Sequence, residues 1–315
     1  MAKRKILIDC DPGHDDAVAL LFAARHLDLV GVTTVHGNND LENITRNALA
    51  VLELGGIEVP LARGCAEPLA MPNAGTAEVH GATGLDGVTL PEPSRRPIDT
   101  HAVDFIIEMA SRHRGELVLA TIGPETNVAL ALRREPRLKH WLAEIAVMGG
   151  STGNGNVTAA AEWNIHCDPE AAWVVFTSGI PIRMVGLNIT RLTGLEQSDI
   201  DRLRRSGRKV ADVIASLLQF YLAKQREGSG ITIAPMHDVC AVLPYAYAGL
   251  IEYAHARVEI ELTGMHTRGM TVCDLRPAAL AAGAKRTPPA NVQVAIAARS
   301  RYIVERVIET LLSYP

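Results

Sequence analysis

The densest chemistry in this sequence is a run of acidic side chains near its start. Residues 9–17 read Asp-Cys-Asp-Pro-Gly-His-Asp-Asp-Ala, which places four carboxylates within eight residues, at the end of an apolar stretch. Like charges this close raise one another's pKa and oppose folding unless a cation or buried donors neutralise them. An acidic helix start, with Asp15 and Asp16 in the first turn, explains one or two of the four. Because no Cys or His recurs at ligand spacing nearby, a hard cation such as Ca²⁺ or Mg²⁺ is the expected partner.

Polar residues also follow several later apolar runs. They are the Gly-Asn pair at 37–38, the Gly-Pro-Glu-Thr-Asn motif at 123–127, the Gly pair at 149–150, the Glu-Trp-Asn triplet at 162–164 and, much later, the His-Asp pair at 237–238. Taken singly, an Asn beside a Gly is more often a turn residue than a ligand contact. By spacing alone, His237 is a surface histidine and Asp238 an ordinary helix-start charge. Together the groups favour a binding site, since ligands bind at the carboxyl ends of parallel strands.

These groups need a scaffold that brings strand ends together, and the pattern of apolar residues predicts one. Short β-branched runs, typical of buried strands, alternate with segments of helical spacing. The strands are expected at 6–10, 30–35, 117–121, 145–148 and 182–185, and the helices near 15–26, 40–54, 100–113, 125–134 and 168–178. This alternation predicts an α/β fold, a mostly parallel open sheet with helices on both faces.

The remainder of the chain is less regular. Residues 64–97 are rich in Gly and Pro and are expected to form a long loop, which in a compact domain is usually functional. Beyond 195 the spacing is mainly helical to about 248, and then come an antiparallel pair at 258–262 and 270–275, a strand at 292–297 and a closing helix to 312. With no repeat and no linker, we expect one domain over 1–315, with mainly helical additions in its C-terminal part.

Composition narrows the class of protein. The 315 residues include 48% hydrophobic and 21% charged residues with a net charge of −4, which is typical of a globular protein. Since Lys and Arg are scattered, neither nucleic acid nor a membrane surface is an expected partner. No apolar run has the length of a membrane span or a signal peptide, so we expect a cytoplasmic protein. Five cysteines without CxxC spacing are expected to be reduced.

The acidic run as a whole resembles the DxDPGxDD signature of the inosine-uridine-preferring nucleoside hydrolases. The likeness continues in order along the chain. It includes Gly37-Asn38, His80-Gly81, the motif at 123–127, Met148-Gly149-Gly150, Glu162-Trp163-Asn164, His237-Asp238 and the Gly-Met-Thr-Val run at 269–272. The resemblance implies the nucleoside hydrolase fold, a parallel-sheet α/β fold that binds one Ca²⁺ ion and cleaves the N-glycosidic bond of ribonucleosides with water.

Carried over residue by residue, the family pattern assigns metal ligands and sugar contacts. The Ca²⁺ ligands it implies are Asp11, Asp16, Asp238 and the backbone carbonyl of Ile122. The residues that would hold the ribose hydroxyls are Asp15, Asn38, Asn156, Glu162 and Asn164, with Met148 packing beneath the sugar. The residue types agree with this assignment, because a vicinal diol is bound by several carboxylates and amides and can complete a calcium shell.

The resemblance also implies catalytic roles. Asp11 would be the general base toward a water that the metal activates. His237 would assist departure of the base, and His80 in the long loop is a second candidate. In the family, the segment that precedes the His-Asp pair sets the preference for a base, and here it is residues 220–236. Within this segment the resemblance places only Gln225 near the base. Purine and pyrimidine nucleosides therefore both stay open as substrates. Family likeness further implies a role in nucleoside salvage and a homo-oligomer, either a dimer or a tetramer.

Two other classes of protein fit parts of the same pattern. An Asp-x-Asp after a first strand also suggests a haloacid-dehalogenase-type phosphatase, in which the first Asp attacks phosphate beside Mg²⁺. That hypothesis leaves Glu162, Asn164 and His237 without a role. A sugar-binding or nucleoside-binding protein that is not an enzyme explains the polar residues, but binding alone needs no metal-activated water. Release of free ribose from inosine and uridine, with and without a chelator, distinguishes the three.

Overall fold

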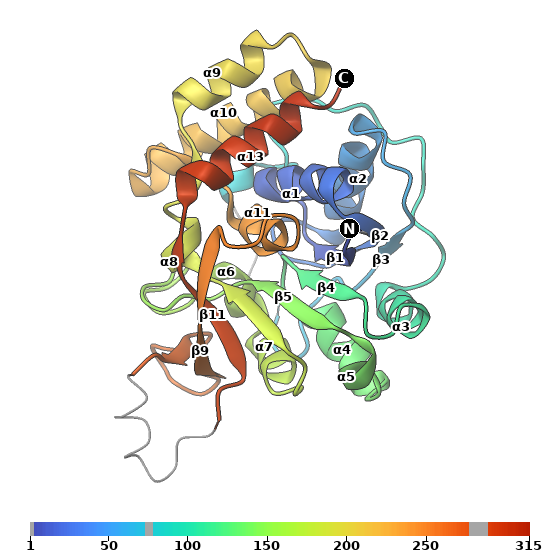
Figure 1. Ribbon diagram of the computed structural model, residues 1–315, viewed down its shortest axis with the longest axis vertical. Helices are drawn as coiled ribbons and strands as arrows, with labels where there is room; N and C mark the ends of the chain where they lie inside the picture. The colour runs from blue at the N-terminus through green and yellow to red at the C-terminus, as the bar shows by residue number, and fades with distance from the viewer. Residues whose placement is uncertain (1–2, 73–77, 277–288) are drawn as a thin grey trace.

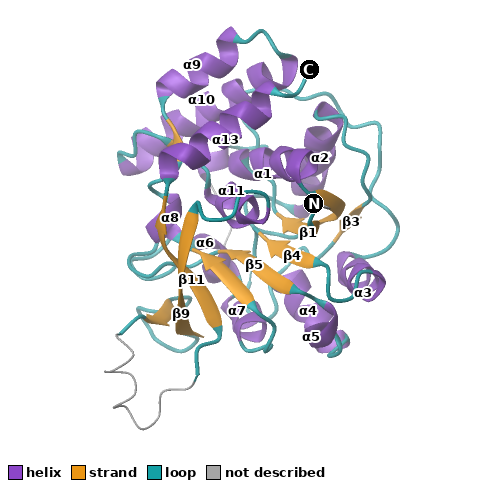
Figure 2. Ribbon diagram, viewed as in Figure 1, coloured by secondary structure: helices purple, strands orange, loops and turns teal. Residues whose placement is uncertain are grey.

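The computed structural model describes residues 3–72, 78–276 and 289–315, and its centre is an open sheet (Figure 1, Figure 2). In spatial order its described strands are β10 (Thr271–Asp274), β9 (Ile251–Ile260), β11 (Val292–Ala298), β6 (Ile182–Val185), β5 (Glu144–Met148), β4 (Val118–Thr121), β1 (Lys5–Cys10), β2 (Asp28–Thr34) and β3 (Leu61–Arg63). Neighbours pair in parallel except at β9, which is antiparallel to both β10 and β11. The prediction of a mostly parallel open sheet is confirmed.

The central strand β1 shows why the sequence reads as a continuous apolar run there. Ile6 and Ile8 enter one hydrophobic core, whereas Leu7, between them, enters another. Successive side chains of a strand point to opposite faces, so both faces of this strand are buried. Such burial requires helices on both sides of the sheet, as in other parallel sheets.

The helices form two layers that cover these two cores (Figure 1). One core is closed by residues of α1 (His14–His26), α2 (Leu41–Leu54), α9 (Gln197–Arg205), α10 (Lys209–Ser229), α11 (His237–Val242) and α13 (Ser300–Leu312). The other core is closed by residues of α3 (Ala102–Arg112), α4 (Thr126–Arg134), α5 (Leu138–Trp141) and α7 (Pro169–Phe176). The prediction of helices on both faces is therefore confirmed.

Short elements that the sequence did not reveal lie between these. They include β3 and α5, whose bounds are given above. The others are η1 (Glu78–His80), α6 (Trp163–Cys167), α8 (Leu187–Thr190), η2 (Leu243–Tyr245) and the antiparallel pair β7 (Gly194–Leu195) and β8 (Ala234–Pro235). A strand of two residues cannot display alternation, which explains why the region after 195 looked purely helical. Of the loop expected at 64–97, residues 73–77 lie outside the described residues, and η1 belongs to the part that is described.

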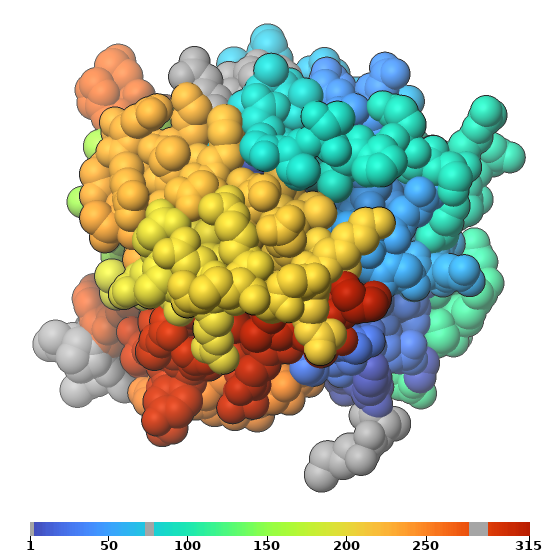
Figure 3. Space-filling view, turned by 90° about the horizontal axis from the view of Figure 1, so that it is seen from above, coloured from blue at the N-terminus to red at the C-terminus, as the bar shows by residue number. Residues whose placement is uncertain are grey.

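The C-terminal helical additions gather over one end of the molecule. The space-filling view shows α9, α10 and α13 side by side, with the segment that follows η1 packed against α10 (Figure 3). Among the described residues, no helix has the length and apolarity to cross a bilayer. All five cysteines are free thiols, and Cys10, Cys167 and Cys240 are buried, as expected.

Candidate active site

An inner pocket of about 90 Å³ opens beyond the carboxyl ends of β4 and β5. The predicted site residues that line it are Asp15, Asp16, Asn38, His80, Ile122, Met148, Asn156, Glu162, Asn164, Gln225, His237 and Asp238. Of the predicted residues only Asp11 is set behind this lining, fully buried. Residues that are more than 200 positions apart in the sequence thus meet at one sheet edge.

Sequence reasoning missed three residues of the pocket wall, namely Val79, Leu187 and Tyr221. Tyr221 lies on α10 four residues before Gln225, so both side chains fall on the same helix face. That spacing is the signal that would have found Tyr221. Val79 and Leu187 belong to η1 and α8, two short elements that carry no periodic pattern.

The floor of the pocket is a group of three aspartates, called here the carboxylate cluster. Oxygen atoms of Asp15, Asp16 and Asp238 lie within 4.8 Å of one another, and all three side chains are buried. They stand in the first turns of α1 and α11, where helix dipoles favour negative charge. Burial raises the pKa values of all three, and for Asp15 and Asp238 the neighbouring carboxylates raise the pKa further. The cluster therefore has the charge and the oxygen atoms of a hard-cation site.

Asp11 lies beside this cluster in a cradle of main chain. Its Oδ2 accepts the backbone N–H of Asn38 at 2.8 Å, whereas its buried Oδ1 has no hydrogen-bond partner among the described residues. A Cβ atom on Gly37 would stand 2.1 Å from Oδ2, and one on Gly123 would stand 2.6 Å from Oδ1. Only glycine fits at these two positions. Burial and the charge of Asp16 raise the pKa of Asp11 well above its usual range.

The opposite wall is built around Glu162, which caps α6. Its carboxylate accepts the backbone N–H groups of Gly150, Asn164 and Ile165 at 2.9–3.2 Å. Burial nevertheless raises the pKa of Glu162 to about 6. The Asn164 amide donates to the carbonyls of Ile122 and Met148, at 3.0 Å each. These bonds fix the orientation of the amide and place the Ile122 carbonyl at the pocket.

His237 begins α11 and is held from behind by α8. Its Nδ1 lies 2.6 Å from the hydroxyl of Thr190, which leaves Nε2 free of protein partners among the described residues. Burial and the charge of Arg191 lower the pKa of His237 to about 4. The ring is therefore neutral at pH 7 and can carry its single proton on either nitrogen.

His80 is part of a stack of rings with His14 and Tyr221, whose centroids lie 5.2–5.4 Å apart. The Nε2 of His14 is 2.8 Å from the carbonyl of Asp86, so this nitrogen carries the proton and donates it. The Nδ1 of His80 lies 2.9 Å from the Nδ1 of His14 and also accepts the backbone N–H of His14 at 3.3 Å, so His14 engages this nitrogen of His80. Burial lowers the pKa of His80 well below its usual range, so the ring is neutral at pH 7.

An outer chamber of about 600 Å³ continues from the inner pocket. The two share Val79, Asn156, Leu187, Gln225 and His237. Arg191 and Lys224 bring positive charge to the outer wall, and Ser229 there donates its hydroxyl to the carbonyl of Gln225 at 2.9 Å. A small polar inner pocket thus opens into a wider chamber, with His237 at the junction.

Comparisons with known proteins point to a single family. Residues 6–303 match the family model for inosine-uridine preferring nucleoside hydrolases. The chain is 39% identical to the pyrimidine-specific ribonucleoside hydrolase RihB of Escherichia coli, over 87% of this chain and 88% of RihB. It superimposes on a plant nucleoside hydrolase with a TM-score of 0.92 and 32% identity, covering 99% of both chains. For a purine-preferring ribonucleoside hydrolase from Gardnerella vaginalis the TM-score is 0.91 and the identity 29%, over 98% of both chains.

Proposed function

Since this chain belongs to the inosine-uridine preferring nucleoside hydrolase family, we propose that it uses a Ca²⁺ ion at the carboxylate cluster to release ribose and free base from ribonucleosides. The observation that carries the proposal is the meeting of Asp15, Asp16 and Asp238 on the pocket floor beside Asp11. Family membership excludes the phosphatase and the purely binding protein as alternatives, because the family consists of hydrolases of N-glycosyl bonds.

The residues present fit a calcium ion. Asp11, Asp16, Asp238 and the Ile122 carbonyl offer only oxygen atoms, which is the donor set that Ca²⁺ prefers. The orphaned Oδ1 of Asp11 is a buried polar atom that needs a partner of this kind. When bound, Ca²⁺ neutralises the buried carboxylates and lowers the pKa of a water molecule beside them.

The other residues of the pocket have roles that follow from their positions. Asp11 lies beside the cluster with its Oδ1 free of hydrogen-bond partners among the described residues, and it would take the proton of the attacking water. Asp15, Asn38, Asn156, Glu162 and Asn164 supply the polar groups that hold the ribose hydroxyls, with Met148 below the ring. The same negative carboxylates favour the positive charge that develops on the sugar as the bond to the base breaks.

Departure of the base needs a proton or a hydrogen bond, and His237 is better placed to give it than His80. His237 lies where the inner pocket meets the outer chamber, and its Nε2 can carry the proton. His80 lines only the inner pocket, and His14 engages its Nδ1, so we assign His80 to supporting the pocket wall. Gln225, which lines both cavities, is positioned beside the base.

The experiment that tests this function compares uridine with 2′-deoxyuridine. A site whose buried polar groups are matched to a diol leaves some of them unpaired when one hydroxyl is missing. Such sites reject the analogue by about 10⁴-fold, so kcat/KM for deoxyuridine should fall by that order. Similar values for the two substrates would contradict the proposed sugar site. Inosine tested beside uridine would show whether the chamber also accepts a purine.

Family membership also supports three broader proposals. We propose that the enzyme serves nucleoside salvage, that it acts in the cytoplasm, and that it forms a homo-oligomer, either a dimer or a tetramer. The mass in solution, measured by light scattering, tests the last of these, and the mass of a single 33.9 kDa chain would contradict it.

A further inference from the structure

The segment that carries Asn156 is an exposed loop with little packing of its own. Residues 151–161 join β5 to α6, and Thr152, Asn154 and Asn156 are exposed. The loop bends back on itself through bonds from the N–H groups of Gly155 and Asn156 to the carbonyls of Ala159 and Ala161, at 3.1 Å each. Nothing in these local bonds fixes the direction in which the loop presents Asn156 to the pocket.

The start of the loop is anchored at Ser151, which makes two hydrogen bonds with Thr271 of β10, at 2.9 and 2.7 Å. The contacts that hold the part nearest Asn156 come from α8 and the residue after it. Arg191 donates from Nη2 to the carbonyl of Gly155 at 2.5 Å and from Nη1 to the carbonyl of Asn154 at 3.4 Å. On the same helix, Asn188 accepts the backbone N–H of Thr152 at 3.4 Å. Among the described residues Arg191 forms no ion pair with a carboxylate, so its charge is directed at these carbonyls.

We propose that Arg191 is a positioning residue, which clamps the loop 151–161 to α8 and so holds Asn156 at the ribose site. A planar guanidinium can reach two successive carbonyls at once, and charge strengthens both hydrogen bonds. Because Thr190 of the same helix holds His237, α8 fixes the loop with respect to that residue as well. The proposal rests on the proposed function only where it assigns ribose to Asn156.

The first test measures the loop itself and needs no substrate. In Arg191→Gln, hydrogen exchange of the amides in 151–161 should become faster than in the wild type, because the clamp is lost. Exchange in the β1 and β4 peptides and the Tm should stay near wild type. Arg204→Gln, which removes an exposed arginine from α9, is the matched control and should leave the loop unchanged. Unchanged exchange at 151–161 in Arg191→Gln would overturn the proposal.

The second test asks whether Arg191 acts through Asn156. Arg191→Gln and Asn156→Ala should each lower kcat/KM for uridine by about 10-fold to 10²-fold, the size of effect that misplaced substrate contacts produce. If Arg191 works by placing Asn156, the double variant should be no worse than the poorer single variant. Multiplied losses would overturn the positioning role and leave a direct effect of the charge.

The variant Arg191→Lys distinguishes the effect of the planar guanidinium from the effect of its positive charge. Lysine keeps the positive charge but lacks the planar pair of donors, so it should recover only part of the lost activity and part of the slow exchange. Full recovery of activity while exchange of the loop stays fast would also overturn the proposal. If the wild type itself released no ribose, the proposed function would fail, whereas the exchange measurement would still decide the role of Arg191.

Discussion

At the scale of single residues, the pocket floor concentrates more buried negative charge than the protein can hold ionised by itself. Asp15, Asp16 and Asp238 approach within 4.8 Å, and their pKa values are raised. The spacing of the DxDPGxDD run predicts such a concentration, because crowded carboxylates need neutralising partners. The expectation of one cation for all four carboxylates does not extend to Asp9, whose Oδ1 accepts hydrogen bonds from Thr33 and Asn127 away from the cluster. The distances and the orphaned Oδ1 of Asp11 depend on main chain from Gly37 and Gly123, which the run itself does not specify.

This charge should make the stability of the metal-free protein depend on pH. A carboxyl whose pKa is raised on folding contributes stability below its unfolded pKa, near 4, and the contribution is lost as the pH rises through its folded pKa. Burial raises the pKa of Asp16 to about 6, and burial together with the charge of Asp16 raises that of Asp15 to about 8. We therefore expect the metal-free protein to lose stability between about pH 4 and pH 8.

Calorimetry with and without Ca²⁺ measures this effect. Because the proposed Ca²⁺ ion would bind the ionised cluster, the rise in Tm on adding it should be larger at about pH 8 than at about pH 5. A rise that stays constant or shrinks with pH would contradict the assignment of the metal to these carboxylates.

A second prediction at this scale separates His237 from its neighbour Asp238. A hydrogen bond from neutral His237 would stabilise the charge that develops on the departing base, and loss of such a donor typically costs about 10²-fold to 10³-fold, so His237→Ala should lose that much activity on inosine or uridine. On p-nitrophenyl riboside, whose phenolate leaves without a proton, the same variant should stay near wild type. Asp238→Ala should harm all three substrates alike, because it removes a proposed ligand of the metal. Equal losses of His237→Ala on every substrate would show that His237 has a structural role.

At the scale of helices and strands, the spacing of apolar residues predicts the longer elements. The shorter elements depend on tertiary contacts, which no local sequence pattern reveals. The expected strands at 6–10 and 145–148 coincide closely with β1 and β5. In contrast α6 and α8 have five and four residues, too few for a helical period. Glu162 caps α6, which carries Asn164. Thr190 of α8 contacts the ring of His237. Both short helices therefore position site residues.

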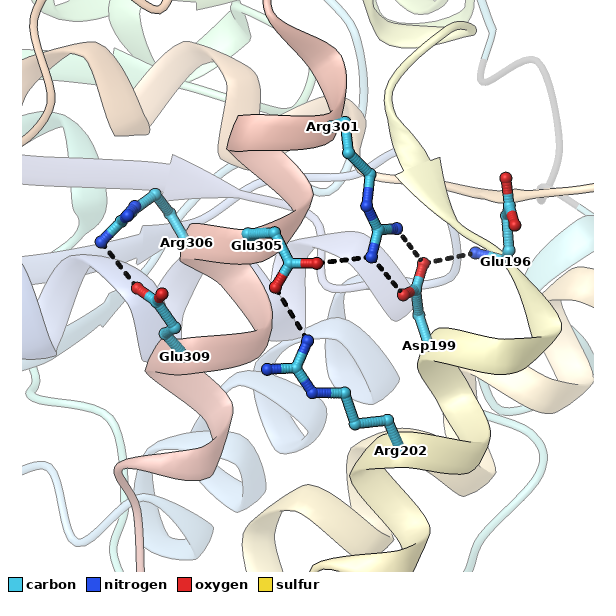
Figure 4. A network of polar contacts seen from close by, with 7 residues as sticks. All are labelled: Glu196, Asp199, Arg202, Arg301, Glu305, Arg306 and Glu309. Atoms are coloured by element: carbon cyan, nitrogen blue, oxygen red, sulfur yellow. Dashed lines mark hydrogen bonds and ion pairs between the residues drawn. The ribbon is translucent and has the colours of Figure 1, made fainter.

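The ion-pair network between α9 and α13 offers a prediction at this scale (Figure 4). Asp199 accepts the backbone N–H of Glu196 at 3.1 Å and binds Arg301 through both oxygens, at 2.7 and 2.9 Å. Its side chain is only 5% exposed, so its bonds are shielded from water. Asp199→Ala should lower the free energy of unfolding by about 1–2 kcal/mol through loss of the cap and the pair, with kcat/KM unchanged.

A matched control lies in the same network. Glu309 pairs with Arg306 on the exposed face of α13 at 2.7 Å, with half of its side chain in water. Glu309→Ala should change the free energy of unfolding by less than about 0.5 kcal/mol, as exposed pairs generally do. Urea unfolding of both variants gives the comparison. Equal effects would show that the shielded bonds of Asp199 add nothing to stability.

At the scale of the whole molecule, the site exists because one sheet brings distant parts of the chain to a common edge. Parallel strands end on the same side, so the meeting of Asn38, Ile122 and Met148 could be predicted from the strand pattern. The position of His237 and Asp238 at this site could not be predicted from the strand pattern, because it depends on α11 packing against α1 across the core. Only the resemblance to the family predicted that these two residues belong to the site.

We propose that this site hydrolyses ribonucleosides with the help of calcium. The most direct measurement is the ribose and free base released from inosine and uridine by the purified protein, before chelation, after chelation and after Ca²⁺ is returned. We predict equal amounts of ribose and base from an accepted nucleoside, loss of release on chelation and recovery with Ca²⁺. Release that continues unchanged in the chelator, or the absence of ribose from both nucleosides, would contradict the account.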